Sequence, residues 1–212
     1  MTPKNHEPQV STETPESKVR LSGTDHVTVE GSNEEDTVAF YRDLLGMPLV
    51  LRQMHLGRPE ITHLFFDTGD GRLLSFFVSD ERETRHDRPM ESSVDPGVGH
   101  VQHIAFSLDP SELGSLRSAL DEVGHDYDEF DRGMFYALYT RDPNGLILEF
   151  DIAKWDVPDG RRAAVLAGAH QARLAAGDDF VRDEHMTAAL EELGIDAERR
   201  DVPDAPAGRA VE

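Results

Sequence analysis

Two histidines and one glutamate lie at positions from which they could bind a metal ion. His26 and His103 each lie near the start of a run of alternating polar and apolar residues, and Glu149 lies in a third such run. Residues two apart in a strand share a face, so all three side chains lie opposite the apolar residues that must face a helix. Two imidazoles and one carboxylate on strands form a facial triad, which is typical of Fe(II) sites with open positions for substrate and dioxygen.

These residues lie in two copies of one structural unit. The first copy has a strand at His26, a helix that ends at Gly46 and three further strands. The second copy repeats this order from His103, with a helix that ends at Gly124. The repeat predicts an α+β fold of two tandem βαβββ modules that form a metal-binding cup, followed by a short C-terminal helical extension.

Turn and capping signals mark where these elements begin and end. Residues Ser32–Glu35 are typical of a capping box, and Asp109–Pro110 is typical of a helix N-terminus. Gly69–Gly71 and Asp142–Gly145 predict the turns that precede the last strand of each module.

Domain bounds follow from these signals and from shifts in composition. Residues 1–20 are polar and proline-containing, which predicts a disordered leader. The two modules are predicted at 21–80 and 98–153. Apolar residues at helical spacing predict C-terminal helices within 154–195, and the charged segment 196–212 predicts a flexible tail.

Composition excludes several classes of function. Forty-two acidic against 21 basic residues give a net charge of -21, which argues against binding nucleic acid or an anionic membrane. The chain has no cysteine, so any metal must be held by nitrogen and oxygen ligands. No apolar run is long enough for a membrane span or a signal peptide, which predicts a cytoplasmic protein. The acidic, lysine-poor composition resembles that of proteins from salt-loving organisms.

The motifs together resemble the vicinal oxygen chelate superfamily, which includes glyoxalase I, extradiol ring-cleaving dioxygenases, epimerases and antibiotic-resistance proteins. The resemblance rests on four stretches: Asp25–Thr28, Ala39–Met47, His103–Phe106 and Asp142–Glu149. It implies the paired-module fold and one divalent metal per chain, held by the two histidines and the glutamate named above.

One further position separates the branches of this superfamily. Glyoxalase-type sites usually add a fourth ligand in the last strand of the first module, where this chain has Ser75. A serine hydroxyl is a poor ligand for a divalent metal, so we expect three protein ligands. This favours Fe(II) and ring cleavage, although Mn, Zn, Ni and Co also suit the ligand set.

A second resemblance is to the hydroquinone-cleaving branch of the dioxygenases. It rests on the stretch Asp131–Tyr139, which lies before the metal glutamate at a similar spacing. By this resemblance Arg132 holds an anionic substrate oxygen, Tyr139 hydrogen-bonds the substrate, and His63 acts as an acid or base. Two plainer roles stay open, because Tyr139 also suits a core position and Arg132 also suits a surface ion pair.

The chain departs from that branch beside its metal ligands. Members of the branch commonly carry a histidine just before each metal histidine, where this chain has Asp25 and Gln102. Three other histidines, His55, His100 and His125, lie in turns or at strand ends, where we expect them to be solvated.

The sequence therefore predicts an Fe(II) extradiol-type dioxygenase that acts on a catechol or hydroquinone-like substrate with dioxygen. Ser75 and Phe77 share a face of their strand, so both are candidate substrate-binding residues, while Phe77 also suits a packing role. The alternatives are a glyoxalase-like (lactoylglutathione lyase-like) or epimerase-like enzyme with a carbonyl substrate, and a metal-free drug-binding protein of the same fold. The modules can pair within one chain or across a homodimer.

Overall fold

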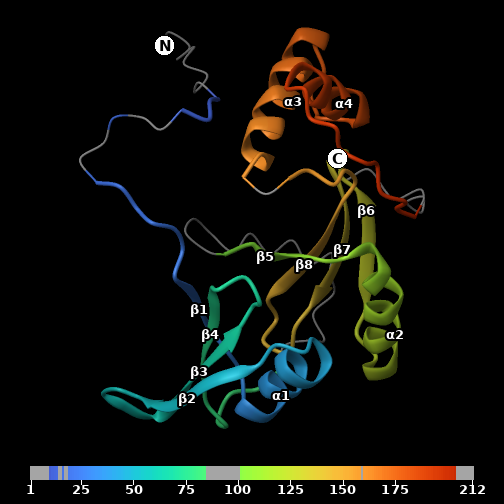
Figure 1. Ribbon diagram of the computed structural model, residues 1–212. Coiled ribbons are helices and arrows are strands. Elements are labelled where there is room, and N and C mark those ends of the chain that lie inside the picture. The colour runs from blue at the N-terminus through green and yellow to red at the C-terminus, as the bar shows by residue number, and fades with distance from the viewer. Residues whose placement is uncertain (1–9, 14–15, 17–18, 85–100, 159, 204–212) are drawn as a thin grey trace, which may run out of the picture. The chain divides into compact units, whose positions relative to one another are not determined.

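The structure is a computed structural model that describes residues 10–13, 16, 19–84, 101–158 and 160–203 (Figure 1). The described residues of the predicted leader, within 10–20, form no helix or strand. The rest of the predicted leader lies outside the described residues. Among the described helices, none is long and apolar enough to cross a membrane.

Each module folds into a four-stranded sheet with the same strand order. The order is β1-β4-β3-β2 in the first sheet and β5-β8-β7-β6 in the second. The first sheet consists of β1 (His26–Glu30), β2 (Leu49–His55), β3 (Arg58–Asp67) and β4 (Leu73–Val78). The second consists of β5 (His103–Ser107), β6 (Tyr127–Asp131), β7 (Phe135–Arg141) and β8 (Ile147–Ala153). The α+β fold with two tandem βαβββ modules is therefore confirmed.

The first and last strands of each module pair with the same register in both modules. β1 runs parallel to β4 with Thr28 opposite Ser75, and β5 runs parallel to β8 with Ala105 opposite Glu149. Ser75 and Glu149 thus occupy equivalent positions, each two residues beyond the strand partner of the candidate ligand histidine of its module. The internal repeat places a hydroxyl in one sheet where it places a carboxylate in the other.

The helix of the first module begins one residue later than its predicted capping box. The side chain of Asn33 caps α1 (Glu34–Val38) by accepting a hydrogen bond of 2.8 Å from the backbone N–H of Asp36. Ser32 does not cap the helix, because its N–H and hydroxyl both donate to Asn144. After α1 the chain continues as the π-helical segment η1 (Ala39–Leu44), which the sequence pattern did not predict.

The helix of the second module has the predicted ends. Asp109 accepts a hydrogen bond from the N–H of Ser111 and so caps the short 3-10 turn η2 (Pro110–Glu112). This turn continues into α2 (Leu113–Val123). Gly124 ends α2 with a φ of 72°, a conformation that glycine adopts without the strain of a side chain.

The first sheet buries one face against α1 and η1. Tyr41 is fully buried, with its ring centroid 4.7 Å from that of Phe76 and 5.4 Å from that of Phe66. The fully or almost fully buried side chains of this core are Phe40, Tyr41, Leu64, Phe66, Leu74, Phe76 and Val78. Burying each large apolar side chain contributes roughly 1.5–3 kcal/mol. The alternating residues of β3 and β4 are left for the opposite face, which carries the candidate site.

A turn of the second module is bonded to the helical segment of the first. The side-chain oxygen of Asn144 accepts hydrogen bonds from the N–H and hydroxyl of Ser32, at 2.6 and 2.8 Å, and from the hydroxyl of Thr37 at 3.1 Å. The buried Tyr41 hydroxyl donates to Asp142 at 2.7 Å. Burial raises the pKa of Asp142, although its hydrogen bonds oppose that rise. This turn therefore has a structural role.

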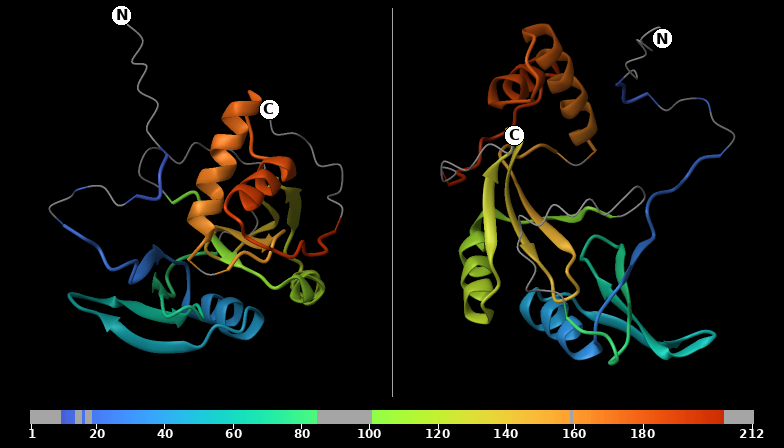
Figure 2. Two further views of the ribbon diagram at one scale, coloured as in Figure 1. Left: turned by 45° about the horizontal axis from the view of Figure 1, so that its top comes forward. Right: turned by 180° about the vertical axis from the view of Figure 1, so that it is seen from behind.

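The chain divides into two compact units. The larger comprises residues 20–128 and 138–151, and the smaller comprises 1–19, 129–137 and 152–212. The smaller unit contains the predicted C-terminal helical extension as α3 (Arg162–Ala176) and α4 (Asp183–Glu192), which pack side by side (Figure 2). Its buried core comprises Trp155, Val165, Ala169, Met186, Ala189 and Leu190.

Close packing and an ion-pair network hold this smaller unit together. Gly133 has a φ of 80°, and a Cβ added there would lie 2.2 Å from the carbonyl oxygen of Val181. The side chain of Lys154 is 2% exposed, and its Nζ lies 2.6 Å from a carboxylate oxygen of Asp131 and 2.7 Å from one of Asp183. A buried lysine needs such partners, so these contacts join the end of β6, the residue that follows β8 and the start of α4.

The segment predicted as a flexible tail has a partner at its start. Arg199 forms an isolated β-bridge with Trp155, and the N–H of Arg200 donates to the carbonyl of Lys154 at 2.8 Å. Residues 204–212 of this segment lie outside the described residues.

Candidate metal centre

His103 and Glu149 meet on the face of the second sheet that lies opposite its helix. Nε2 of His103 is 2.8 Å from Oε2 of Glu149, and the Glu149 side chain is only 5% exposed. The parallel pairing of the edge strand β5 with β8 brings these two residues together, because Ala105 lies opposite Glu149 and His103 is two residues away on the same face. A nitrogen and an oxygen that converge in this way are a ligand pair that a divalent metal can bridge in place of a proton.

In both candidate ligand histidines, Nδ1 contacts a side-chain oxygen of the preceding residue. Nδ1 of His26 lies 2.6 Å from a carboxylate oxygen of Asp25, and Nδ1 of His103 contacts the side-chain oxygen of Gln102. An acceptor at Nδ1 keeps the proton on that nitrogen and leaves Nε2 as the metal-binding atom. This is the arrangement that metal-ligating histidines usually show, so the residues fit a divalent metal.

The described residues do not bring His26 into contact with the other two predicted ligands. Within the described part of the chain, Asp178, Glu184 and His185 form the one group of three ligand-type side chains whose ligand atoms lie within 4.8 Å of one another. The structure therefore forms the His103–Glu149 half of the predicted triad. His26 lies on β1 of the first sheet, at the equivalent place in its own module.

Tyr139 orients Glu149. Its hydroxyl donates to Oε1 of Glu149, while Oε2 of the same carboxylate faces His103. The tyrosine ring also lies edge-on to the imidazole of His103, with centroids 6.1 Å apart. The structure thus places Tyr139 within the centre, where it can act on the metal ligands by positioning them.

Ser75 occupies the position in the first module that corresponds to Glu149. Its side chain is fully buried, and its hydroxyl lies 2.6 Å from that of Thr28. The hydroxyl is therefore engaged within the sheet, between β1 and β4. This arrangement agrees with a set of three protein ligands.

Aromatic rings form a continuous strip across the first sheet, on the face that carries His26. The strip runs from His26 through Phe65, His63 and Phe77 to His55. Successive ring centroids in that order are 5.7, 4.1, 4.4 and 4.8 Å apart. Two of its members were singled out by the sequence, His63 as the acid or base and Phe77 as a substrate-binding residue. The strip gives this face an apolar surface suited to a flat ligand.

His63 is held as a neutral base within this strip. Burial, and then the neighbouring imidazoles of His55 and His26, lower the pKa of His63 from its usual value. Its Nε2 is buried and has no hydrogen-bond partner among the described residues. A neutral imidazole with a free nitrogen can accept or donate a proton, as the predicted acid or base role requires.

His55 differs from the solvated residue that the sequence predicts. It is half-buried, its ring lies edge-on to Phe77, and its Nδ1 is buried without a hydrogen-bond partner in the described structure. Strand alternation could have indicated this position. His55 is two residues from Gln53, which pairs with His63, so alternation places the His55 side chain on the same face as His63. His125 also has contacts, since its Nδ1 lies 2.8 Å from the carbonyl of Arg141. His100 lies outside the described residues.

Arg132 belongs to the smaller unit. Its guanidinium lies over the ring of Phe130, 4.6 Å from the centroid. It lines a surface cavity of about 530 Å³ together with the connection between α3 and α4, including Phe180 and Arg182. The predicted role of Arg132 in holding a substrate oxygen therefore stays a prediction.

The cluster in the smaller unit fits a structural role better than a metal site. Nδ1 of His185 accepts a hydrogen bond from the backbone N–H of Arg182, at 3.0 Å. That acceptor role places the proton of a neutral imidazole on Nε2, which lies 3.0 Å from a carboxylate oxygen of Asp178. A metal would need the opposite tautomer, so this pair ties the start of α4 to the preceding loop.

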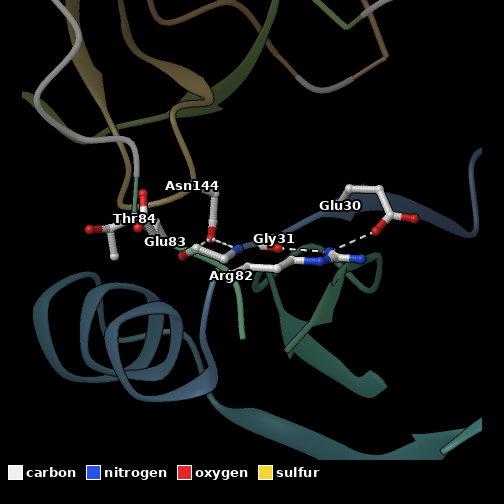
Figure 3. A pocket seen from close by; sticks show the side chains of 7 residues that line it. Glu30, Gly31, Arg82, Glu83, Thr84 and Asn144 are labelled. Atoms are coloured by element: carbon white, nitrogen blue, oxygen red, sulfur yellow. Dashed lines mark hydrogen bonds and ion pairs between the residues drawn. The ribbon is translucent and has the colours of Figure 1, made fainter. Parts of the chain in front are cut away.

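A second cavity, of about 570 Å³, lies at the ends of β1 and β4 (Figure 3). Arg82 lines it and donates to the carbonyls of Gly31 and Phe77, at 2.8 and 2.9 Å, while forming an ion pair with Glu30. Asn144, on the same wall, is bonded to Ser32. These polar groups are bonded to one another and to the backbone, so we assign the cavity a structural role.

Comparisons with known proteins agree with this fold. The profile of the glyoxalase/bleomycin resistance protein/dioxygenase superfamily matches residues 23–150. Among curated proteins, none matches the chain. A candidate dioxygenase from Bacillus subtilis is 20% identical, with a TM-score of 0.50, over 64% of this chain and 42% of its own. This chain therefore spans less than half of that protein's length.

Two further solved structures are reported by the comparison. A glyoxalase/bleomycin resistance protein/dioxygenase domain from Frankia is 17% identical with a TM-score of 0.50, over 66% of this chain and 96% of its own. The fosfomycin resistance protein FosX from Listeria monocytogenes, a mutant solved with Mn(II), is 17% identical with a TM-score of 0.46, over 62% of this chain and 90% of its own.

Proposed function

The chain belongs to the glyoxalase/bleomycin resistance protein/dioxygenase superfamily, and on that premise we propose that it is a mononuclear metalloenzyme with a ring-cleaving dioxygenase activity. His26, His103 and Glu149 are the proposed ligands. The observation that carries the proposal is the pairing of His103 with Glu149 in one module, while the equivalent Ser75 of the other module is buried and bonded to Thr28. Three protein ligands leave positions for both a substrate and dioxygen.

Fe(II) is the metal that this ligand set favours, and when bound it would supply Lewis-acid activation of a phenolic substrate and reduction of dioxygen. The side chains around it have separate tasks. Asp25 and Gln102 hold the tautomers of the two histidines, and Tyr139 holds the Glu149 carboxylate toward His103. These residues keep the ligand atoms oriented before the metal binds.

The first sheet would receive the substrate. Phe65 and Phe77 flank His63 and form an apolar surface for a catechol or hydroquinone-like ring. The free Nε2 of His63 is placed to take the proton of a substrate hydroxyl. The rings also exclude water from the face on which the substrate lies.

His26 must join His103 and Glu149 for the triad to be complete. The two modules of one chain can provide this, or modules of two copies in a homodimer can. Mixing the inactive His26→Ala and His103→Ala variants distinguishes the two arrangements. If modules pair across copies, mixed dimers regain up to half of the sites, whereas sites within one chain stay inactive in the mixture.

A lyase or isomerase of the glyoxalase or epimerase type is the second candidate. The observation that favours it is His63, whose lowered pKa and free nitrogen also suit abstraction of a proton beside a carbonyl. In that reaction the metal would polarise a carbonyl oxygen, and no dioxygen would be consumed.

Oxygen uptake separates the two candidates. We expect the anaerobically prepared Fe(II) protein to consume one dioxygen per phenolic substrate cleaved, when screened with catechols and hydroquinones. His103→Ala, with the metal ligand removed, is the control for uptake by free iron. Absence of uptake throughout the screen, together with turnover of an α-hydroxy or α-keto carbonyl compound, would contradict ring cleavage and support the second candidate.

A further inference from the structure

The end of the aromatic strip that lies farthest from His26 collects unpaired nitrogen groups. Nδ1 of His55 and Nε2 of His63 are buried, and neither has a hydrogen-bond partner among the described residues. Both imidazoles contact the ring of Phe77, with centroids 4.8 and 4.4 Å away. Buried polar atoms nearly always have partners in folded proteins, so two orphan nitrogens beside one ring call for a ligand.

Arg58 adds a positive charge at the same place. Its guanidinium lies 5.6 Å from the centroid of the Phe77 ring. Over the described parts of the chain, Arg58 has no ion-pair partner, although acidic residues outnumber basic ones by 42 to 21. Two other arginines of the first module differ, since Arg52 pairs with Glu34 and Arg72 pairs with Asp70. An unpaired arginine in so acidic a chain is the group that an anion would meet.

The topology of the sheet explains why these groups gather. His63 lies opposite Phe77 in the antiparallel pairing of β3 with β4, so both side chains are on one face. His55, at the end of β2, pairs with Arg58, at the start of β3, where a bulge shifts the register. That bulge brings the guanidinium over a face to which simple alternation would not direct it.

We propose that Arg58 and His55 form a subsite for the oxyanion group of an organic substrate, with Phe77 as the apolar floor between this subsite and His63. The proposal rests on the proposed function only in placing the metal at the other end of the strip. The substrate class is thereby narrowed to molecules with a flat apolar body and a carboxylate or phosphonate group away from the atoms that chelate the metal. Guanidinium and imidazole N–H groups bind both oxyanions by charge-assisted hydrogen bonds.

The equivalent positions of the second module do not repeat the subsite. Ala137 and Asp151 occupy the places of His63 and Phe77, by the register that aligns Ser75 with Glu149. A methyl group and a carboxylate cannot hold an anion. The subsite is therefore a property of the first module. Substitutions in the subsite should leave the His103–Glu149 pair of the second module intact.

Binding of three small probes to the metal-free full chain tests the proposal. The probes are benzoate, phenylphosphonate and the neutral benzyl alcohol. Their binding is measured by NMR of the histidine ring protons. We expect at least one of the two anions to bind ten or more times tighter than benzyl alcohol and to shift the signals of His55 and His63. Equal affinity for all three probes, or shifts elsewhere only, would overturn the proposal, and the preferred anion identifies the oxyanion.

Three variants assign the effect to the proposed groups. Arg58→Gln and His55→Phe should each weaken binding of the preferred anion at least tenfold and leave benzyl alcohol unchanged. Arg72→Gln, at an exposed arginine already paired with Asp70, is the matched control and should bind like the wild type. Circular dichroism and thermal melting of each variant show that it is folded. Unchanged anion affinity in folded Arg58→Gln would overturn the proposal.

Failure of this subsite and failure of the proposed metal centre give different results. His103→Ala should lose the metal and keep anion binding, because the subsite lies on the other sheet. Arg58→Gln should keep the metal and lose anion binding. A protein that binds metal normally but shows no preference for anions would refute the subsite and leave the metalloenzyme proposal standing.

Discussion

The two modules share one fold and one register but carry different chemistry on the same sheet face. In the second module, the residue two positions beyond the strand partner of His103 is Glu149. Its carboxylate lies 2.8 Å from Nε2 of His103 and is oriented by Tyr139. In the first module the same position holds Ser75, whose hydroxyl is engaged by Thr28. The place of Tyr139 is taken by Phe65, which contacts His26 through its ring alone.

This difference separates two tasks that one metal site must perform. The second module provides the carboxylate and its hydrogen-bond partner, which suits a metal ion. The first module provides one imidazole and then a strip of aromatic rings, which suits a substrate. A duplicated unit can specialise in this way because residue changes on the sheet face opposite the helix leave the apolar core on the other face unaltered.

Making the second module resemble the first gives the largest expected effect. Glu149→Ser removes the one carboxylate ligand, and we expect metal affinity to fall at least a hundredfold, as measured by competition with a chelating indicator. Glu122→Ser, on the exposed side of α2, is the control. Affinity unchanged from the wild type would show that the metal centre does not depend on the difference between the modules.

The residues beside the two histidines give the next largest effect. Asp25→Ala and Gln102→Ala remove the acceptors at Nδ1, and loss of such partners typically lowers metal affinity about 10- to 100-fold. Gln102→Glu should restore the acceptor, and its charge should hold the metal at least as tightly as the wild type does. Asp43→Ala, at an exposed aspartate, serves as the control. If both alanine variants bind metal normally, the hydrogen bonds at Nδ1 are incidental.

The turns that precede β4 and β8 should differ in how much they contribute to the free energy of unfolding. Asn144→Ala leaves the N–H and the hydroxyl of buried Ser32 without their acceptor, which should cost about 1–3 kcal/mol in urea unfolding. The corresponding Asp70 of the first module is exposed and bonded to Thr68 and Arg72, which lower its pKa to about 2. Asp70→Ala should therefore change the free energy of unfolding much less. Equal losses would contradict the structural role of the Asn144 turn.

The smallest expected effect concerns pH. Because the folded state lowers the pKa of His63, the unfolded chain binds a proton at a pH where the folded one does not. This histidine therefore stabilises the protein less as pH falls below about 6.5, the usual pKa of histidine. NMR titration of the metal-free protein should place the His63 midpoint below that value. His63→Phe should flatten the pH dependence of unfolding in that range, and a midpoint at or above 6.5 would contradict the burial argument.

Much of the fold was predictable because the elements of the repeat are defined by residues close to them in the sequence. Strand alternation, the glycine at the end of each module's helix and the turn motifs all lie within a few residues of the elements they define. The π-helical segment η1 was not predictable, because its widened turn goes with the packing of Tyr41 against Phe66 and Phe76, which lie far from it in the sequence. Likewise the capping residue of α1 shifted by one position because Ser32 is used by Asn144, which lies far away in the sequence.

The candidate site was predictable only in part. Strand parity correctly placed His103 and Glu149 together on one face of the second sheet. It could not reveal that Tyr139 bonds Glu149, since that contact depends on the register of β7 against β8. His55 was missed because it stands at a strand end, where a bulge in the pairing with β3 decides its surroundings.

Metal content tests the central claim most directly. Protein purified anaerobically in high salt would be analysed by elemental analysis, as moles of each metal per chain, alongside His103→Ala and the control His170→Ala in α3. We predict close to one divalent metal ion per chain in the wild type and in His170→Ala, and almost none in His103→Ala. Equal metal content in wild type and His103→Ala would contradict the proposed centre.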